Sequence, residues 1–377
     1  MTMWVEGVWL GLMSGTSVDA IDVVALGPCP SRPYAGALLG HWQSPWPAEL
    51  QARLQALPLA PPRSWSEYME LDVAVSAAHA QAVHDFLEHT SLPESPHAIG
   101  FHGQTIFHAP QQKNTLQLGS AAHLAARLNL PVVADLRRAD MAQNGQGAPL
   151  ASAFHHALWG LDDVPTAVLN LGGIANLSIL REGELCAGFD TGPANGLMDS
   201  WVQRHWQQSF DLQGALARQG QVVPGLLQAW LQDPYFQLPA PKSTGREYFH
   251  LDWAGLNSDN GHDAEPANVL RTLLELSVQT VTQALAEWPV KRVIMVGGGS
   301  RNDFLVEQLK LNNPSLDFCH SAEWGWPYDT IEAGTMAWLA MRHCAATPGN
   351  AVTVTGADQH VILGAYYPAP VPSSDGK

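Results

Sequence analysis

The sequence has little charge, little cysteine and no long hydrophobic run. Only 14% of its 377 residues are charged, and 35 Asp and Glu outnumber 19 Lys and Arg, which gives a net charge of −16. This acidic balance argues against partners such as bulk nucleic acid or anionic membranes, because both attract cationic surfaces. A bound anion would have to be held by backbone N–H groups, a metal ion or a few Arg and Lys side chains.

The four cysteines lie far apart and form no CxxC pair: Cys29, Cys186, Cys319 and Cys344. This spacing predicts neither a disulfide framework nor a zinc knuckle, and it fits a reducing compartment. No apolar run reaches the ~18 residues of a transmembrane helix. The first basic residue is Arg32, so a signal peptide's basic region is lacking. We therefore expect a cytoplasmic protein.

Apolar residues are abundant, at 46% of the chain. At roughly 100–200 residues per domain, the length predicts two domains, and the alternation of strand-like and helix-like segments predicts the α/β class. We expect a first lobe of residues 1–140 plus about 346–370. The second lobe is expected over 141–345, with an insertion at about 211–262.

Two strand pairs are joined by glycine-containing turns. Strands are predicted over 4–13 and 20–26, and again over 166–171 and 174–180. Residues 28–63 read as irregular and 190–195 as a loop. Helices are expected at about 66–89, 120–129, 197–208, 268–288, from 302 onward and 331–345. The repeated pattern suggests two similarly built halves.

The first turn has the composition of an anion site. Adjacent N–H groups around Gly15, Thr16 and Ser17 can surround a phosphate, and the carboxylates of Asp19 and Asp22 can hold Mg²⁺ directly or through water. The alternative is an ordinary hairpin turn, in which the same residue types are common.

Two further glycine turns allow the same interpretation. Gly172-Gly173 joins the second strand pair, and its alternative is a hairpin that needs positive φ. The two hairpin turns, facing each other across a cleft, would hold a triphosphate. The run Gly297-Gly298-Gly299 follows a strand and precedes a helix, which favours a purine edge or a phosphate. It matches neither GxGxxG nor GxxxxGK[ST], and its alternative is a tight strand-to-helix turn.

Asp190 lies between glycines just after the second strand pair. Such an acid can act as a general base toward water or a hydroxyl, or it can be the N-cap of the next helix. Glu332 begins the last helix, where an acid complements the helix dipole.

Histidines and arginines offer other interpretations. His102 and His108 would suggest a zinc hydrolase, but no third ligand lies at a recognised spacing. Arg138 can bind a substrate carboxylate bidentately, or form a surface ion pair with Asp135 or Asp140.

Seven segments together resemble the anhydro-N-acetylmuramic acid kinase family, in order from about residue 8 to residue 345. They are residues 11–26, 100–108, 134–150, 169–178, 188–199, 296–305 and 328–340. The resemblance implies an actin/hexokinase/Hsp70-type fold of two ribonuclease-H-like domains that flank an ATP cleft. It implies a cytosolic, generally dimeric enzyme of peptidoglycan recycling. With ATP and Mg²⁺, the enzyme opens the anhydro ring with water and phosphorylates O6.

The resemblance also assigns residues. Asp190 would be the general base. The nucleotide segments would be Gly15, Thr16, Ser17, Val18, Asp19, Ala20, Ile21, Asp22, Gly172, Gly173, Asn176, Gly297, Gly298, Gly299 and Asn302, with Asp19 and Asp22 near Mg²⁺. The sugar side would include His102, Gln104, Arg138, Asp140, Thr191 and Glu332. Val18 and Ala20 stand where the family more often has Leu and Gly.

Two alternatives stay open. One is a kinase of the same fold that acts on another sugar, and Arg138 argues against a neutral hexose because its charge would have no partner. The other is a non-catalytic ATP-gated clamp, because one fold can host unrelated functions. Sugar-dependent release of ADP separates a kinase from a clamp.

Overall fold

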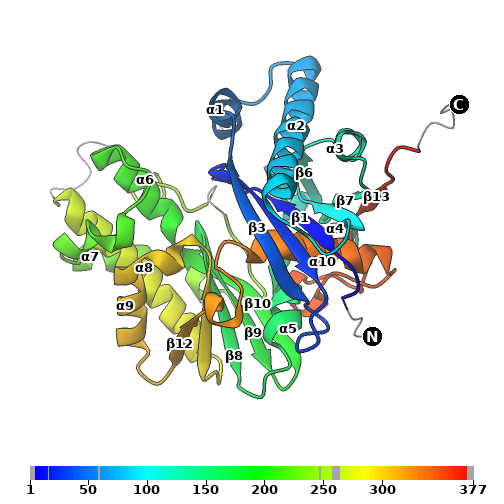
Figure 1. Cartoon of the computed structure of the whole chain (residues 1–377). Helices are drawn as coiled ribbons and strands as arrows, with labels where there is room; N and C mark the ends of the chain where they lie inside the picture. The colour runs from blue at the N-terminus through cyan, green and yellow to red at the C-terminus, as the bar shows by residue number, and fades with distance from the viewer. Residues whose placement is uncertain (1–4, 16, 58–59, 246–247, 257–263, 372–377) are drawn as a thin grey trace, which may run out of the picture. The chain divides into compact units, whose positions relative to one another are not determined.

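The computed structural model describes residues 5–15, 17–57, 60–245, 248–256 and 264–371 (Figure 1). The chain divides into two compact units, Met1–Leu158 with Asp329–Lys377, and Trp159–Tyr328. The boundaries therefore differ from those we expected at 140 and 345. The last long helix, α10 (Ile331–Cys344), packs on strands of the first sheet, which places it in the first unit.

The first unit contains a six-stranded sheet in the order β13-β7-β4-β1-β2-β3. β1, β2 and β3 form an antiparallel meander, whereas β4 runs parallel to β1 and β7 parallel to β4. The strands are β1 (Trp9–Met13), β2 (Ala20–Gly27), β3 (Ala37–Pro45), β4 (Ala98–Phe101), β7 (Val132–Ala134) and β13 (Ala365–Tyr367), and a separate hairpin pairs β5 (Gln104–Ala109) with β6 (Asn114–Leu118). The predicted first hairpin is confirmed, with Met13 opposite Asp22.

Helices cover both faces of this sheet. Leu10 and Leu12 belong to the hydrophobic core that also contains residues of α2 (Trp65–His89). Gly11 points to the other face, where a Cβ atom would lie 1.8 Å from the Ala333 carbonyl oxygen of α10. Glycine is thus required for the close approach of α10. The remaining helices are α1 (Ala48–Ala56), α3 (Ala121–Leu128), α4 (Arg138–Ala142), α5 (Ala151–Trp159) and α11 (Val352–Thr355).

The second unit repeats this strand order. Its sheet runs β10-β9-β8-β11-β12, with an antiparallel meander of β8, β9 and β10 followed by the parallel strands β11 and β12. The strands are β8 (Thr166–Leu171), β9 (Ile174–Arg181), β10 (Glu184–Pro193), β11 (Arg292–Val296) and β12 (Asp317–His320). The helices are α6 (Asn195–Trp206), α7 (Pro224–Leu231), α8 (Pro266–Ala286) and α9 (Asp303–Asn312) (Figure 1). Both units therefore have the ribonuclease-H-like order, and the predicted α/β class is confirmed.

Two predicted irregular regions are ordered elements. Residues 28–63 contain β3 and α1, and Asp190 to Pro193 form the end of β10 instead of a loop. Backbone pairing with a neighbouring strand explains the two strands, because β3 pairs with β2 and β10 pairs with β9. Within the described part of the chain, none of the helices has the length and apolar character that a membrane span requires.

The core of the first unit contains a histidine whose burial predicts that stability falls in acid. His79 is fully buried, and burial lowers its pKa to about 4. The unfolded chain binds this proton near pH 6.5, so stability is complete above that pH and is lost as the pH falls toward 4. We expect His79 to account for about 2 kcal/mol of the stability lost between pH 7.5 and pH 5.

Urea unfolding at the two pH values tests this expectation. The variant His79→Leu should lose about 2 kcal/mol less than the unmodified protein over this interval. His123→Leu, at an exposed position of α3, is the control and should keep the original pH dependence. An unchanged pH dependence in His79→Leu would contradict the assignment.

Candidate functional site

The β1–β2 turn is held by side chains from elsewhere in its unit. The Gly15 carbonyl oxygen accepts hydrogen bonds from Val18 N at 3.0 Å and Gln104 Nε2 at 3.2 Å. Gln51 Nε2 donates to the Val18 carbonyl oxygen at 2.8 Å. Val18 has φ of 57°, which is rare for a β-branched residue. Gln104, predicted on the sugar side, thus contacts the predicted phosphate turn. Thr16 lies outside the described residues.

The two carboxylates predicted for Mg²⁺ differ in their surroundings. Asp19 is exposed, whereas Asp22 Oδ1 accepts from Gln43 Nε2 at 3.0 Å and lies 3.3 Å from His41 Nε2. Burial lowers the pKa of His41, but the Asp22 hydrogen bond and the Asp329 charge outweigh it and raise the pKa. Among the described residues, no three His, Cys, Asp or Glu side chains are grouped to hold a metal. Mg²⁺ is usually bound by one or two carboxylates with phosphates and waters, a role that fits Asp19 better than Asp22.

His102 is buried, and both of its ring nitrogens have partners. Nδ1 lies 2.9 Å from the Gly103 carbonyl oxygen, so Nδ1 carries the proton, and Nε2 accepts from Arg137 Nε at 3.0 Å. Burial and the Arg137 charge lower the pKa of His102 to about 3, which keeps the ring neutral at pH 7. His108 Nδ1 lies 3.1 Å from Thr115 Oγ1. The described residues therefore give the zinc alternative no support.

The two neighbouring arginines have different roles. Burial lowers the pKa of Arg137 to about 10, although Glu332 favours its charged form. The Arg138 side chain is 52% exposed, and its Nη1 lies 3.6 Å from Asp135 Oδ2. Its contacts with the Thr115 carbonyl oxygen are long, at 3.3 and 3.4 Å. Arg138 thus forms the surface ion pair with Asp135 that the sequence analysis gave as the alternative. Its guanidinium stays accessible to solvent.

Asp140 connects distant parts of the first unit. It is fully buried, and its Oδ1 accepts from Asn350 Nδ2 at 2.9 Å and Thr355 Oγ1 at 2.7 Å. Its Oδ2 accepts from Gly147 N at 2.8 Å. These bonds tie the loop after α4 to the C-terminal segment, so the structure gives Asp140 a structural role.

The β8–β9 turn adjoins the start of α6. The Gly173 carbonyl oxygen accepts from Ala194 N and Gly196 N, and the Gly172 carbonyl oxygen accepts from Asn195 N, all at 3.0 Å. Neither glycine has positive φ, so the predicted alternative of a positive-φ hairpin is wrong. A Cβ on Gly172 would meet its nearest atom, the Ile174 carbonyl oxygen, only at 3.4 Å. Neither backbone conformation nor packing requires glycine there.

Two other predicted nucleotide glycines share this property. A Cβ on Gly15 would meet its nearest atom at 3.6 Å, and one on Gly298 would meet none within 4 Å. Gly297, by contrast, has φ of 79° and its Cβ would lie 2.3 Å from Asn170 Oδ1. Where neither backbone strain nor crowding requires glycine, a common reason for it is that the protein backbone must come close to a ligand such as a phosphate.

Asp190 lies at a bulge in β10. It pairs with Asn176, whereas Gly192 pairs with Ala175, which leaves Thr191 as the extra residue. Bulges redirect side chains and are frequent beside active sites. Asp190 Oδ2 accepts from Thr244 N at 2.9 Å, so one carboxylate oxygen has a fixed direction.

Some predicted residues have mainly structural contacts. Ala20 and Ile21 begin β2, and the Ile21 side chain is in the core. Thr191 Oγ1 donates to the Ala175 carbonyl oxygen at 3.3 Å. Asn302 is the N-cap of α9 and is confirmed at the start of a helix.

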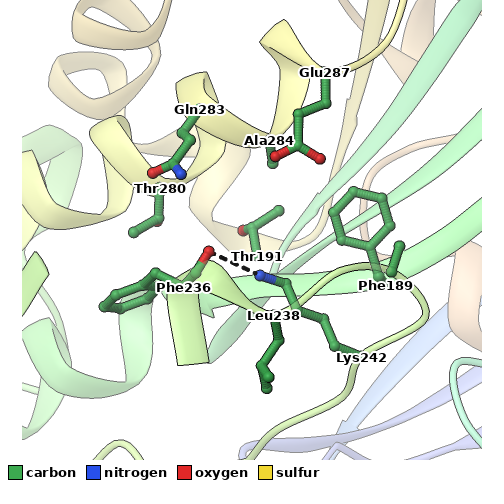
Figure 2. Close-up of a pocket in the computed structure, with 10 residues that line it drawn as sticks. Phe189, Thr191, Phe236, Leu238, Lys242, Thr280, Gln283, Ala284 and Glu287 are labelled. Carbon is green, nitrogen blue, oxygen red and sulfur yellow. Dashed lines mark hydrogen bonds between the residues drawn. The ribbon is translucent and has the colours of Figure 1, made fainter. Parts of the chain in front are cut away.

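A small pocket lies between β10, α8 and the segment 236–242 (Figure 2). Asp190 is not among its lining residues, but Lys242 is, and its Nζ donates to the Phe236 carbonyl oxygen at 3.4 Å. The full lining is Phe189, Thr191, Phe236, Leu238, Ala240, Lys242, Thr280, Gln283, Ala284 and Glu287.

Sequence reasoning missed the residues that contact Asp190 from this segment. Tyr235, Lys242 and Thr244 lie within the region expected to be an insertion, where no motif was identified. Their spacing from Asp190 in the sequence follows no helical or strand periodicity. Their contact with Asp190 could therefore be found only in the folded structure.

The repeated strand order, with a glycine turn in each unit, defines the class of two-lobed α/β proteins with the ATPase fold. A family model described as "Anhydro-N-acetylmuramic acid kinase" matches residues 7–369. The chain belongs to this family, and it is therefore a phosphotransferase that uses ATP, with a small sugar as its substrate class.

Three solved structures are similar over most of the chain. The activator of the 2-hydroxyisocaproyl-CoA dehydratase from Clostridium difficile with bound ADPNP is 11% identical, with a TM-score of 0.45, covering 90% of this chain and 96% of that one. A ROK hexokinase from Thermus thermophilus is 14% identical, with a TM-score of 0.38 and coverages of 89% and 99%. A ROK family glucokinase from Streptomyces griseus in complex with glucose and AMPPNP is 14% identical, with a TM-score of 0.38 and coverages of 88% and 98%.

Proposed function

We propose that the protein converts 1,6-anhydro-N-acetylmuramic acid, water and ATP into N-acetylmuramic acid 6-phosphate and ADP, a step of peptidoglycan recycling. The observation that carries this proposal is the position of Asp190, whose carboxylate is oriented at a β-bulge by the Thr244 N–H group. An acid with a fixed direction suits a general base. The family match over residues 7–369 supports the same reaction.

In this mechanism, Asp190 accepts a proton from the water that attacks the anomeric carbon. The bond between that carbon and O6 breaks, and O6 attacks the γ-phosphorus while the bond from phosphorus to the β–γ bridging oxygen breaks. ADP leaves, and Asp190 releases its proton to solvent. Phosphoryl transfer depends mainly on positioning and charge neutralisation. Backbone N–H groups and a hydrated Mg²⁺ would supply these contributions.

The nucleotide is proposed to contact the glycine turns. The space at Gly15, Gly172 and Gly298 fits a ligand that approaches the backbone closely. Mg²⁺ would be held by phosphate oxygens and water, and Asp19 would be the carboxylate that binds the ion or one of its waters. A homodimeric state and a cytoplasmic location belong to the same proposal.

The sugar side is proposed to include Arg138. Among the described residues, its exposed guanidinium has long contacts with the Thr115 carbonyl oxygen and one surface carboxylate as a partner, so it is available to a substrate carboxylate. Gln104, His102 and Glu332 would complete this side. His102 would act through Arg137, because its own ring nitrogens are already bonded.

A coupled ADP-release assay tests the proposal. We expect sugar-dependent ADP with 1,6-anhydro-N-acetylmuramic acid, and its loss when Mg²⁺ is removed by a chelator. The control sugar is 1,6-anhydro-N-acetylglucosamine, which lacks the lactyl carboxylate and should react at least ~10-fold less efficiently, as expected when a charged pair is left unmade. Higher activity with a neutral sugar would favour a different kinase, and ATP binding without sugar-dependent ADP would favour a clamp.

A further inference from the structure

One segment of the second unit forms hydrogen bonds with both the backbone and the carboxylate of Asp190. Residues 233–244, here called the strap, lie along β10, which is the edge strand of its sheet. Tyr235 Oη donates to the Asp190 carbonyl oxygen at 2.9 Å, and Asp190 N donates to the Lys242 carbonyl oxygen at 3.0 Å. With the bond from Thr244 N to Oδ2, three strap residues fix the position of one acid.

The strap is closed on itself by a half-buried cation. Lys242 Nζ donates to the Tyr235 carbonyl oxygen at 3.2 Å and lies 4.9 Å from the centre of the Tyr235 ring. Burial lowers the pKa of Lys242, whereas the charges of Glu287 on α8 and Asp190 on β10 favour its protonated form. Figure 2 shows Lys242 reaching past Thr191 toward Phe236, with Glu287 on the opposite side of the pocket. The printed hydrogen bonds of the Lys242 side chain therefore lie within the strap, while its backbone carbonyl oxygen accepts from Asp190 N.

Tyr235 is suited to hold the backbone at this point. It is 6% exposed, and burial together with the Asp190 charge raises the pKa of its hydroxyl, so the hydroxyl stays a donor. Its ring packs against Phe249 at a centroid distance of 5.4 Å, which fixes the direction of Oη.

We propose that Tyr235 and Lys242 are positioning residues for the reaction: Tyr235 holds the backbone of Asp190, and the Lys242 ammonium group holds the strap closed around Tyr235. This inference rests on the proposed role of Asp190. It assigns a function to a segment that the sequence presented as an insertion.

A matched pair of tyrosine variants tests the role of Tyr235. Tyr235→Phe removes the hydroxyl that bonds Asp190, whereas Tyr248→Phe removes one that bonds Asp233 at 3.0 Å in the same aromatic cluster. We expect Tyr235→Phe to lower kcat about 10-fold with KM for sugar and ATP within about 2-fold, because misplacement of a base affects the reacting geometry. Tyr248→Phe should stay within about 2-fold. Equal kcat values, with Tm matched, would overturn the role of Tyr235.

A pair of lysine variants tests the role of Lys242. Lys242→Met keeps the length of the side chain but cannot donate to the Tyr235 and Phe236 carbonyl oxygens, so the strap is held less tightly and kcat should fall about 10-fold with KM within about 2-fold. Lys242→Arg keeps a donor and should restore most of kcat. An unchanged kcat in Lys242→Met, with Tm matched, would overturn this role. If the unmodified protein releases no sugar-dependent ADP, the proposed function fails; if Asp190→Asn is inactive while the strap variants behave normally, only the present inference fails.

Discussion

Asp190→Asn is expected to lower kcat by about 10²–10⁴-fold, the range that a general base contributes. The amide cannot accept the proton of the attacking water, so the chemical step loses its base. The fold should survive, because the Asn oxygen can still accept the hydrogen bond that Thr244 N donates to Oδ2. The coupled ADP-release assay gives kcat, and circular dichroism checks the fold.

Nucleotide binding separates a catalytic from a structural effect in this variant. Calorimetric titration with a non-hydrolysable ATP analogue should give an affinity within about 3-fold of the unmodified protein. Asp303→Asn, an exposed acid in the first turn of α9, is the matched control and should keep its turnover. Turnover near the unmodified level in Asp190→Asn would remove Asp190 from the role of base.

Gly172→Ala is expected to raise KM for ATP at least ~10-fold while Tm changes little. A Cβ at this turn meets its nearest protein atom at 3.4 Å and needs no positive φ, so folding is scarcely affected. A phosphate that approaches the backbone closely would collide with the added methyl group. Steady-state kinetics at saturating sugar gives KM, and thermal unfolding gives Tm.

Two other glycines provide controls. Gly225 in α7 has no neighbour within 4 Å of its Cβ position and no positive φ, so Gly225→Ala should leave KM for ATP unchanged. Gly183 has φ of 79°, so Gly183→Ala should cost about 1 kcal/mol of stability without changing KM. The phosphate role of Gly172 is wrong if its variant also keeps the original KM.

Strong periodicity made some elements predictable from the sequence. The apolar spacing over 268–288 gave a helix that the structure places at Pro266–Ala286, and the strand pattern around Gly172 gave the hairpin of β8 and β9. In each case the hydrophobic pattern agreed with the local preference of the backbone. The glycine turns that join these elements were visible for the same reason.

Other elements depend on partners that a single sequence does not display. β10 ends in Gly188–Pro193, whose glycines and proline are typical of a turn, yet pairing with β9 makes it a strand. β3 shows no clear alternation, because its residues are mostly half-buried. Tertiary pairing overrides local preference in both strands.

The sequence identified which residues belong to the candidate site more reliably than it identified the role of each residue. Asp140 was identified, but its partners Asn350 and Thr355 are 210 and 215 positions away, so its structural role was invisible. Arg137 and Arg138 are adjacent and chemically alike, and only the fold turns one toward His102 and the other toward the surface.

The strap has a consequence for the behaviour of the protein in concentrated solution. An uncovered edge strand offers unpaired backbone groups to another molecule and promotes self-association. Tyr235 and Lys242 occupy such groups at Asp190, so the residues proposed to position the base also cover part of this edge. Substitutions that loosen the strap are therefore expected to promote self-association as well as to lower kcat.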